Sequence, residues 1–128
     1  MMSQLLENFY SELSSTYTTE NSDVFSCNIK LNPEHEVYKG HFPEIPISPG
    51  VALIQVIKEI LMNKFQQELM LTEGSNVKFL ALINPKETAD FQIDFIVKKT
   101  DHTFDVSANF MNADKAFTKF KGKFKSVQ

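Results

Sequence analysis

The longest hydrophobic pattern in the chain predicts one buried helix, from Pro49 or Gly50 to about Glu68. Its apolar residues recur at helical spacing and widen into a band over most of the circumference: Val51, Leu53, Ile54, Val56, Ile57, Ile60, Leu61, Met62 and Phe65. A surface helix is apolar along one stripe, whereas a helix that is apolar nearly all round is covered by other parts of the protein. We therefore expect this helix to lie in the core.

Alternating apolar and polar residues elsewhere predict β-strands. The expected strands are Val24–Leu31, Val77–Leu82, Phe91–Lys98, Phe104–Phe110 and Ala116–Lys125. Successive side chains on a strand point to opposite faces, so each segment presents one apolar face. Thr100 to His102 is expected to form a hairpin turn between two of these strands.

The first 23 residues follow a different pattern. Apolar residues have the spacing of a short amphipathic helix at Leu5, Leu6, Phe9, Tyr10 and Leu13. The run from Ser14 to Asp23 is rich in Ser and Thr, which favours a loop. Residues 1–23 are thus predicted to form an N-terminal helix and loop.

The order of strand, loop, long helix and further strands favours an α+β fold in one domain, residues 1–128, with its core at residues 24–125. An antiparallel sheet wrapped around the helix lets the two apolar surfaces cover each other. Such a sheet has open edges with unpaired backbone groups, and pairing an edge with a second copy removes them. We expect a homodimer or a higher oligomer.

Charge and composition narrow the range of partners. The net charge is −3, and all thirteen basic residues are Lys, which argues against a nucleic-acid partner. The single cysteine, Cys27, cannot form an internal disulfide, and the N-terminus lacks the basic and apolar regions of a secretory signal. No apolar stretch reaches the roughly 18 residues of a membrane span. We expect a cytoplasmic protein.

The histidines and the cysteine do not predict a metal site. The three histidines include no pair at ligand spacing, so no metal is expected. His35 and His102 are interpreted as structural residues, and Cys27 as a buried apolar residue, because it alternates with Phe25 and Ile29. Nothing in the sequence implies a nucleotide or flavin cofactor.

The segment from His35 to Val51 carries the candidate chemistry. Pro43, Pro46 and Pro49 stiffen it around His41, so that one imidazole is held at low entropic cost. The segment ends at Gly50, where the predicted helix begins. The first N–H groups of a helix have no internal partner and carry partial positive charge, so they can polarise a carbonyl oxygen. A base and an oxyanion site thus lie nine positions apart.

These residues resemble a known family. Gly40-His41-Phe42-Pro43, then Pro46, then Pro49-Gly50-Val51 and a helix, is similar to the G-H-F-P-x-x-P-x-x-P-G-V pattern of the 3-hydroxyacyl-(acyl-carrier-protein) dehydratases. The resemblance covers about residues 24 to 125 and implies a dimeric hotdog fold without a cofactor. It also implies that His41 is the base that removes the C2 proton and that the Gly50 amide binds the thioester carbonyl. Val51 and Phe42 are the neighbouring substrate-binding candidates.

One position departs from that pattern. The family carries an acid, Glu or Asp, fourteen positions after the histidine and across the dimer interface, and here this position is Gln55. An amide forms hydrogen bonds but does not deliver a proton. Three alternatives stay open: His41 returns the proton itself, Glu59 one helical turn further on supplies it, or dehydration has been lost.

The sequence therefore supports several functions. The first is dehydration, or the reverse hydration, of a 3-hydroxyacyl thioester on acyl carrier protein or coenzyme A, in fatty acid, polyketide or polyene synthesis. The alternatives are a catalytically silent acyl-binding subunit of a hetero-oligomer and a hotdog thioesterase. Lysines on one face of the last strand offer a docking surface for an acidic carrier protein: Lys119, Lys121, Lys123 and Lys125.

Overall fold

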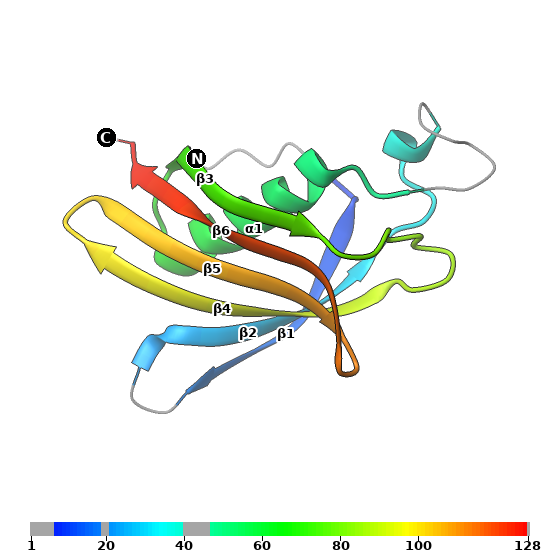
Figure 1. Ribbon diagram of the computed structural model, residues 1–128, viewed down its shortest axis with the longest axis horizontal. Coiled ribbons are helices and arrows are strands. Elements are labelled where there is room, and N and C mark those ends of the chain that lie inside the picture. Colours follow the sequence, from blue (N-terminus) through cyan, green and yellow to red (C-terminus); the bar gives the residue numbers. More distant parts are fainter. Residues whose placement is uncertain (1–6, 19–20, 40–46, 128) are drawn as a thin grey trace.

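The computed structural model describes residues 7–18, 21–39 and 47–127. In this part of the chain, six strands form one antiparallel sheet around one α-helix (Figure 1), which confirms the predicted α+β class. In chain order the elements are β1 (Tyr10–Thr18), β2 (Asn21–Leu31), the 3-10 helix η1 (Glu36–Tyr38), α1 (Gly50–Phe65), β3 (Leu69–Phe79), β4 (Asp90–Thr100), β5 (Thr103–Asn112) and β6 (Lys115–Ser126). The strand order is β1-β2-β4-β5-β6-β3.

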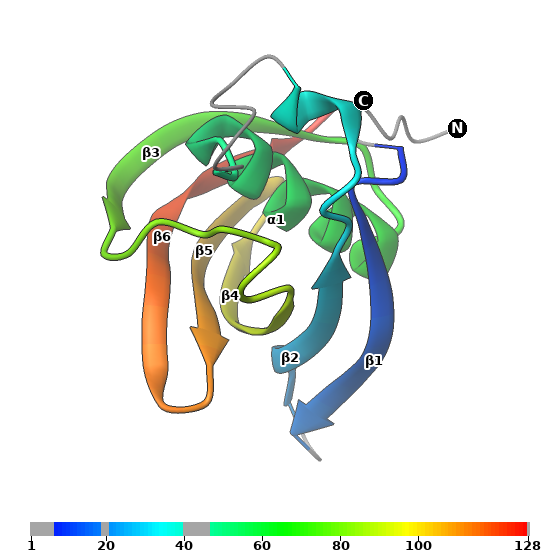
Figure 2. The same ribbon diagram turned by 90° about the vertical axis from the view of Figure 1, so that its right-hand side faces the viewer.

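The sheet curls around α1, as the view along the curl shows (Figure 2). Its inner face is lined by buried aromatic side chains that alternate with outward polar residues: Phe25, Phe91, Phe95, Phe104, Phe110, Phe120 and Phe124. Because strand side chains alternate between the two faces, the apolar set packs on the helix while the polar set faces outward. The predicted hairpin turn is present between β4 and β5, where Asp101 has φ 54°.

Helix α1 lies in the core, as its pattern predicts. Eight of its sixteen residues are buried, and the buried set includes the carboxylic acid Glu59. The helix begins at Gly50, with Pro49 as N-cap, and ends at Phe65 rather than near Glu68. Gln66 takes the left-handed conformation, φ 54°, and its N–H donates to the Met62 carbonyl, which closes the last turn. No described helix is long and apolar enough to cross a membrane.

The predicted N-terminal helix is wrong where the structure describes it. Residues Tyr10 to Thr18 form strand β1, and β2 already starts at Asn21, so most of the predicted loop is also strand. β1 pairs with β2 in antiparallel register, with Tyr10 opposite Leu31. Pairing with the next strand, β2, outweighed the local helical spacing.

Strand β3 is longer than predicted and starts earlier, at Leu69 instead of Val77. It pairs only with β6, so its other side is a sheet edge, and nearly all its residues are exposed. Two register shifts, between Leu71 and Glu73 and between Gly74 and Asn76, interrupt its alternation. Those irregularities explain why a period-2 pattern missed its first half.

Candidate active site

The start of helix α1 presents unoccupied backbone donors. The N-cap Pro49 makes no side-chain hydrogen bond, and its carbonyl accepts from the Ala52 and Leu53 amides at 3.0 and 3.2 Å. In the described ranges, the amides of Gly50 and Val51 donate to no backbone carbonyl. Val51 is 78% exposed. At the positive end of the helix, two amides thus have no backbone acceptor among the described residues, and such amides bind a carbonyl oxygen.

An aromatic ring closes one side of this helix start. A Cβ built on Gly50 would lie 2.5 Å from Cζ of Phe79, the last residue of β3. The glycine thus lets the ring lie directly against the helix backbone. Phe79 is half-exposed, so its ring also forms part of the surface beside the two amides.

The segment that carries the predicted base is fastened at both ends. The Tyr38 hydroxyl and the Ser48 hydroxyl form a buried hydrogen bond of 2.9 Å, and the Ser48 amide donates to the Ile83 carbonyl at 2.9 Å. Burial raises the pKa of Tyr38, so its hydroxyl stays protonated. His41 and Phe42 lie between these anchors and outside the described residues. Their roles stay predictions.

Gln55 belongs to a row of residues on one face of α1. Val51, Gln55 and Glu59 follow at intervals of four, which places them one above the other. Burial rises along this row: Val51 is 78% exposed, Gln55 is half-buried and Glu59 is 2% exposed. The row leads from the open helix start into the core.

At the buried end of the row, Gln55 and Glu59 form a polar cluster with Tyr10. Nε2 of Gln55 donates to Oε2 of Glu59 at 3.2 Å. The phenol of Tyr10, from β1, lies close to the same carboxylate: burial, and then the charge of Glu59, raise the pKa of Tyr10 far above its usual value, so the phenol keeps its proton. Helical spacing predicts Glu59 near Gln55, but no sequence pattern assigns a role to Tyr10, which only strand β1 brings inward.

Two residues interpreted as structural are confirmed as such. His35 is the N-cap of η1: its Nδ1 accepts from the Val37 amide at 3.0 Å, and its Nε2 lies 3.0 Å from the Glu7 carbonyl. Cys27 is fully buried, and desolvation raises its pKa to about 12, so it does not act as a thiolate. Among the described residues, no cluster could hold a metal ion.

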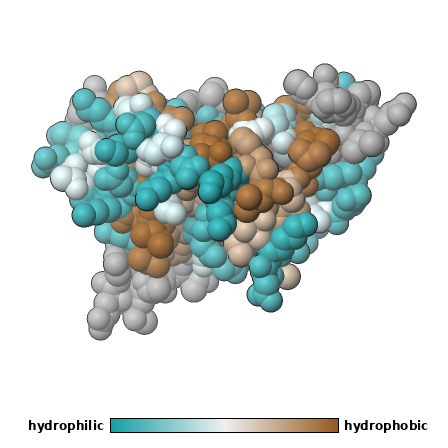
Figure 3. All heavy atoms as spheres, in the orientation of Figure 1, coloured by the Kyte–Doolittle hydropathy of each residue, from teal (hydrophilic) through white to brown (hydrophobic). Residues whose placement is uncertain are grey.

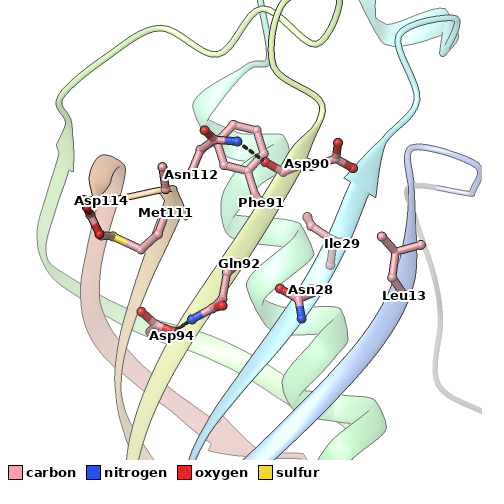
Figure 4. A pocket seen from close by; sticks show the side chains of 11 residues that line it. Leu13, Asn28, Ile29, Asp90, Phe91, Gln92, Asp94, Met111, Asn112 and Asp114 are labelled. Carbon is pink, nitrogen blue, oxygen red and sulfur yellow. Dashed lines mark hydrogen bonds between the residues drawn. The ribbon is translucent and has the colours of Figure 1, made fainter.

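A hollow of about 610 Å³ lies on the other side of the sheet from α1 (Figure 4). Asn28, Gln92 and Asp94 point into it from β2 and β4, and Leu13 reaches it from β1. Its lining mixes polar and apolar residues and includes none of Val51, Gln55 and Glu59, so the hollow is separate from that row. We therefore place the candidate site at the helix start.

The outer surface of the sheet also carries concentrated positive charge. Six exposed lysines from β3, β4 and β6 form what we call the lysine face: Lys78, Lys98, Lys119, Lys121, Lys123 and Lys125. Its one recorded ion pair in the described chain joins Lys123 to Asp105 at 3.9 Å. Figure 3 looks onto this side of the sheet and shows hydrophilic residues beside hydrophobic patches. The lysine face therefore contrasts with the net charge of −3 of the whole chain.

Sequence comparisons identify similar proteins. A family model described as ApeI-like, ApeI dehydratase, matches residues 17–121. The 3-hydroxyacyl-[acyl-carrier-protein] dehydratase FabZ of Acinetobacter baumannii is 40% identical over 45 residues, which is 35% of this chain and 30% of that protein. The match to this relative thus spans less than a third of its length.

Solved structures share the architecture. A dehydratase heterocomplex, ApeI:P from Xenorhabdus doucetiae, superimposes with a TM-score of 0.70 at 18% identity, covering 90% of this chain and 96% of that chain. An uncharacterized protein from Erwinia carotovora subsp. atroseptica gives a TM-score of 0.64 at 21% identity, covering 92% and 95%. At such identities the likeness concerns the fold alone, and it confirms the predicted hotdog fold.

Proposed function

The chain belongs to the ApeI-like dehydratase family, and from this we propose that it dehydrates a 3-hydroxyacyl thioester to the enoyl thioester, and catalyses the reverse hydration. The observation that carries the proposal is the open start of α1. Its two available amides, at Gly50 and Val51, follow directly on the G-H-F-P-x-x-P-x-x-P-G-V pattern. Dehydration of a thioester needs such donors, because negative charge develops on the carbonyl oxygen when the C2 proton leaves.

In the proposed reaction, His41 takes the C2 proton while the Gly50 and Val51 amides hold the thioester oxygen. The electron pair of the C2–H bond forms the C2–C3 double bond, and the C3–O bond breaks. The imidazolium of His41 returns its proton to the departing hydroxyl, so that water leaves. Gln55 holds that hydroxyl by hydrogen bonds, since its amide has no proton to transfer.

The anchors around the base support this assignment. The hydrogen bond between Tyr38 and Ser48 holds the two ends of the His41 segment together, two residues before the helix start. Three residues of extended chain span about 11 Å at most. His41 follows three positions after Tyr38, and this short tether supports its proposed role beside the two amides.

The proposed assembly is a homodimer joined along β3. This strand is a sheet edge, and exposed apolar residues lie on it or just after it: Met70, Leu71, Phe79, Leu80 and Leu82. An exposed apolar edge is normally covered by another chain. Phe79, which touches Gly50, lies within this surface, so a second copy would also border the helix start.

The proposed substrate carrier is acyl carrier protein, docked through the lysine face. An acidic carrier is attracted by six exposed lysines, whereas the rest of the chain is acidic. Coenzyme A is the alternative carrier, and fatty acid, polyketide or polyene synthesis is the proposed setting. These assignments also fit a cytoplasmic enzyme without a cofactor.

A catalytically silent acyl-binding subunit is the second candidate. Gln55 in place of the family's acid favours it, and the structural neighbour from Xenorhabdus doucetiae is described as a heterocomplex. In such an assembly an active partner would supply the missing chemistry.

The deciding experiment follows enoyl absorbance with the purified chain and 3-hydroxyacyl or enoyl thioesters of several lengths. We expect the 3-hydroxyacyl and enoyl thioesters to reach equilibrium from either starting compound. The rate should fall at least about 100-fold in His41→Ala. His102→Ala, in the exposed β4–β5 turn, is the matched control and should keep full activity.

Three outcomes contradict the proposal in different ways. Unchanged turnover in His41→Ala removes the proposed base. Release of free thiol without enoyl formation identifies a thioesterase. Binding of acyl carrier protein with no equilibration in either direction identifies the silent subunit.

A further inference from the structure

A carboxylate among the buried residues of α1 requires an explanation. Glu59 is 2% exposed, and the other buried residues of the helix are apolar. Removing a carboxylate from water costs free energy, so burial of Glu59 is not explained by stability alone.

The partners of Glu59 come from two different elements. Gln55, one turn earlier on α1, donates through Nε2 at 3.2 Å. Tyr10, at the start of β1, lies close enough to the same carboxylate for the charge of Glu59 to raise the pKa of its hydroxyl. Glu59 therefore joins the sheet edge to the polar residue nearest the open helix start.

Burial determines how Glu59 can act. Along the row of Val51, Gln55 and Glu59, a ligand at the helix start meets Gln55 before it reaches Glu59. The half-buried Gln55 amide covers the carboxylate, since the hydrogen bond lies between the two side chains. Direct proton delivery from Glu59 to a substrate would first require Gln55 to move away.

We propose that Glu59 and Tyr10 are positioning residues that fix the Gln55 side chain in the orientation used for the substrate hydroxyl. A carboxylate accepts hydrogen bonds only, so it selects the NH₂ end of the amide and turns the carbonyl oxygen Oε1 away from itself. Oε1 and the second N–H of Gln55 are then presented toward the helix start. The Tyr10 hydroxyl holds the carboxylate in the position that makes this selection.

This inference rests on the dehydratase function proposed above, and it adds two residues to that site. Its consequence is that Gln55 acts as one part of a three-residue unit. A carboxylic acid at position 55 would need no such selection, because both of its oxygens accept hydrogen bonds. The inference thereby explains two features together: the buried polar cluster, and a glutamine at position 55 where the family has an acid.

The test is a double-mutant cycle between Glu59→Leu and Gln55→Ala, measured as kcat and KM of enoyl thioester hydration. Leu keeps the volume and removes the acceptor. We expect Glu59→Leu alone to lower kcat about tenfold or more with little change in KM. In the Gln55→Ala background the same change should lower kcat no further, because Glu59 acts through Gln55.

Two further variants separate positioning from a structural role. Glu59→Gln keeps an acceptor oxygen and should recover part of the kcat that Glu59→Leu loses, while Tyr10→Phe should lower kcat by a smaller factor. The melting temperature of Glu59→Leu should fall by no more than about a few degrees, because Gln55 is only half-buried and its freed N–H can bind water. Glu34→Gln, a change at an exposed residue, is the matched control and should alter neither kcat nor the melting temperature.

A measurement independent of turnover keeps the inference testable if the chain is not a dehydratase. In ¹⁵N-glutamine-labelled protein, the side-chain NH₂ signal of Gln55 is identified by its loss in Gln55→Ala. It should shift in Glu59→Leu and Tyr10→Phe but not in Glu34→Gln. An inactive wild type with these shifts refutes the proposed function and retains the positioning unit. Additive kcat losses, or a Gln55 signal indifferent to Glu59 and Tyr10, overturn the inference.

Discussion

The two edge strands of the sheet, β1 and β3, contact helix α1 with different chemistry. From β1, Tyr10 reaches inward and places its phenol close to buried Glu59. From β3, Phe79 lays an aromatic ring against Gly50 at the helix start. The β1 contact is polar and enclosed, whereas the β3 contact is apolar and half-exposed.

The outward sides of the two edges differ as well. β1 shows polar residues with local hydrogen bonds, such as Ser15 to Glu12 at 3.0 Å, and one exposed leucine, Leu13. β3 and the residues after it expose a longer apolar surface. We infer that β1 orients the interior of the site, while β3 is the edge that a second copy covers.

The largest effect is expected from charging the β3 edge. The double change Met70→Lys and Leu71→Lys should convert the proposed dimer to a monomer at micromolar concentration, because two charges would have to be buried in its contact. Light scattering measures the mass. Leu13→Lys, the same change on the β1 edge, is the control and should leave the mass unchanged. Loss of the dimer in Leu13→Lys as well would contradict the assignment of the dimer contact to β3.

Gly50→Ala tests the β3 contact at the helix start. The new methyl group would meet the Phe79 ring at 2.5 Å, but a half-exposed ring can turn outward, so we expect a melting temperature only a few degrees lower. A displaced Phe79 ring also changes the surface beside the two amides, and we expect hydration to slow about 100-fold. A loss of stability with full activity would show that the amides do not bind the substrate.

Gln55→Glu tests the β1 side by adding a second carboxyl group beside Glu59. Two adjacent carboxylates raise the pKa of one of them, so position 55 keeps a proton to higher pH and can serve as an acid. We expect hydration to be about tenfold faster. A decrease would mean that Gln55 is fitted to a different reaction.

The same variant should also show a pH-dependent loss of stability. A carboxyl whose folded-state pKa is raised binds more protons in the folded state than in the unfolded state, where it is about 4.3. The stability of Gln55→Glu should therefore fall as the pH rises through the raised pKa. Melting temperatures at pH 5 and pH 8 measure the loss, with the wild type as reference.

The smallest effect is expected at Thr118, which lies on β6 opposite Phe79. Its hydroxyl is buried, and among the described residues it has no hydrogen-bond partner. Thr118→Val keeps the shape and removes the unpaired group, so the free energy of unfolding should rise by about 1 kcal/mol. Denaturant unfolding measures the change, and a decrease would reveal a partner for the hydroxyl.

The fold could be predicted from the sequence where burial imposes a regular period. The nearly continuous apolar band gave the helix to within three residues, and alternating Phe residues gave β4, β5 and β6. The prediction from sequence failed at the two edge strands, β1 and β3. Each edge strand has a partner on one side only, and both pairings contain register shifts, so little alternation was imposed on either strand.

The candidate site could be predicted only along continuous chain. The motif from Gly40 to Val51 is contiguous, and Gln55 and Glu59 are one helical turn apart, so both were visible. Tyr10 was assigned to a helix, because its link to Glu59 depends on β1 lying beside α1. That contact joins residues 49 positions apart, and no local pattern encodes it.

The buried thiol of Cys27 has a practical consequence. With its pKa raised to about 12, the thiol stays protonated at pH 8, and the sulfur is fully enclosed. Maleimide reagents therefore leave the native cysteine unmodified. A single cysteine introduced on the lysine face can then carry a fluorescent dye and report carrier docking without any change to the core.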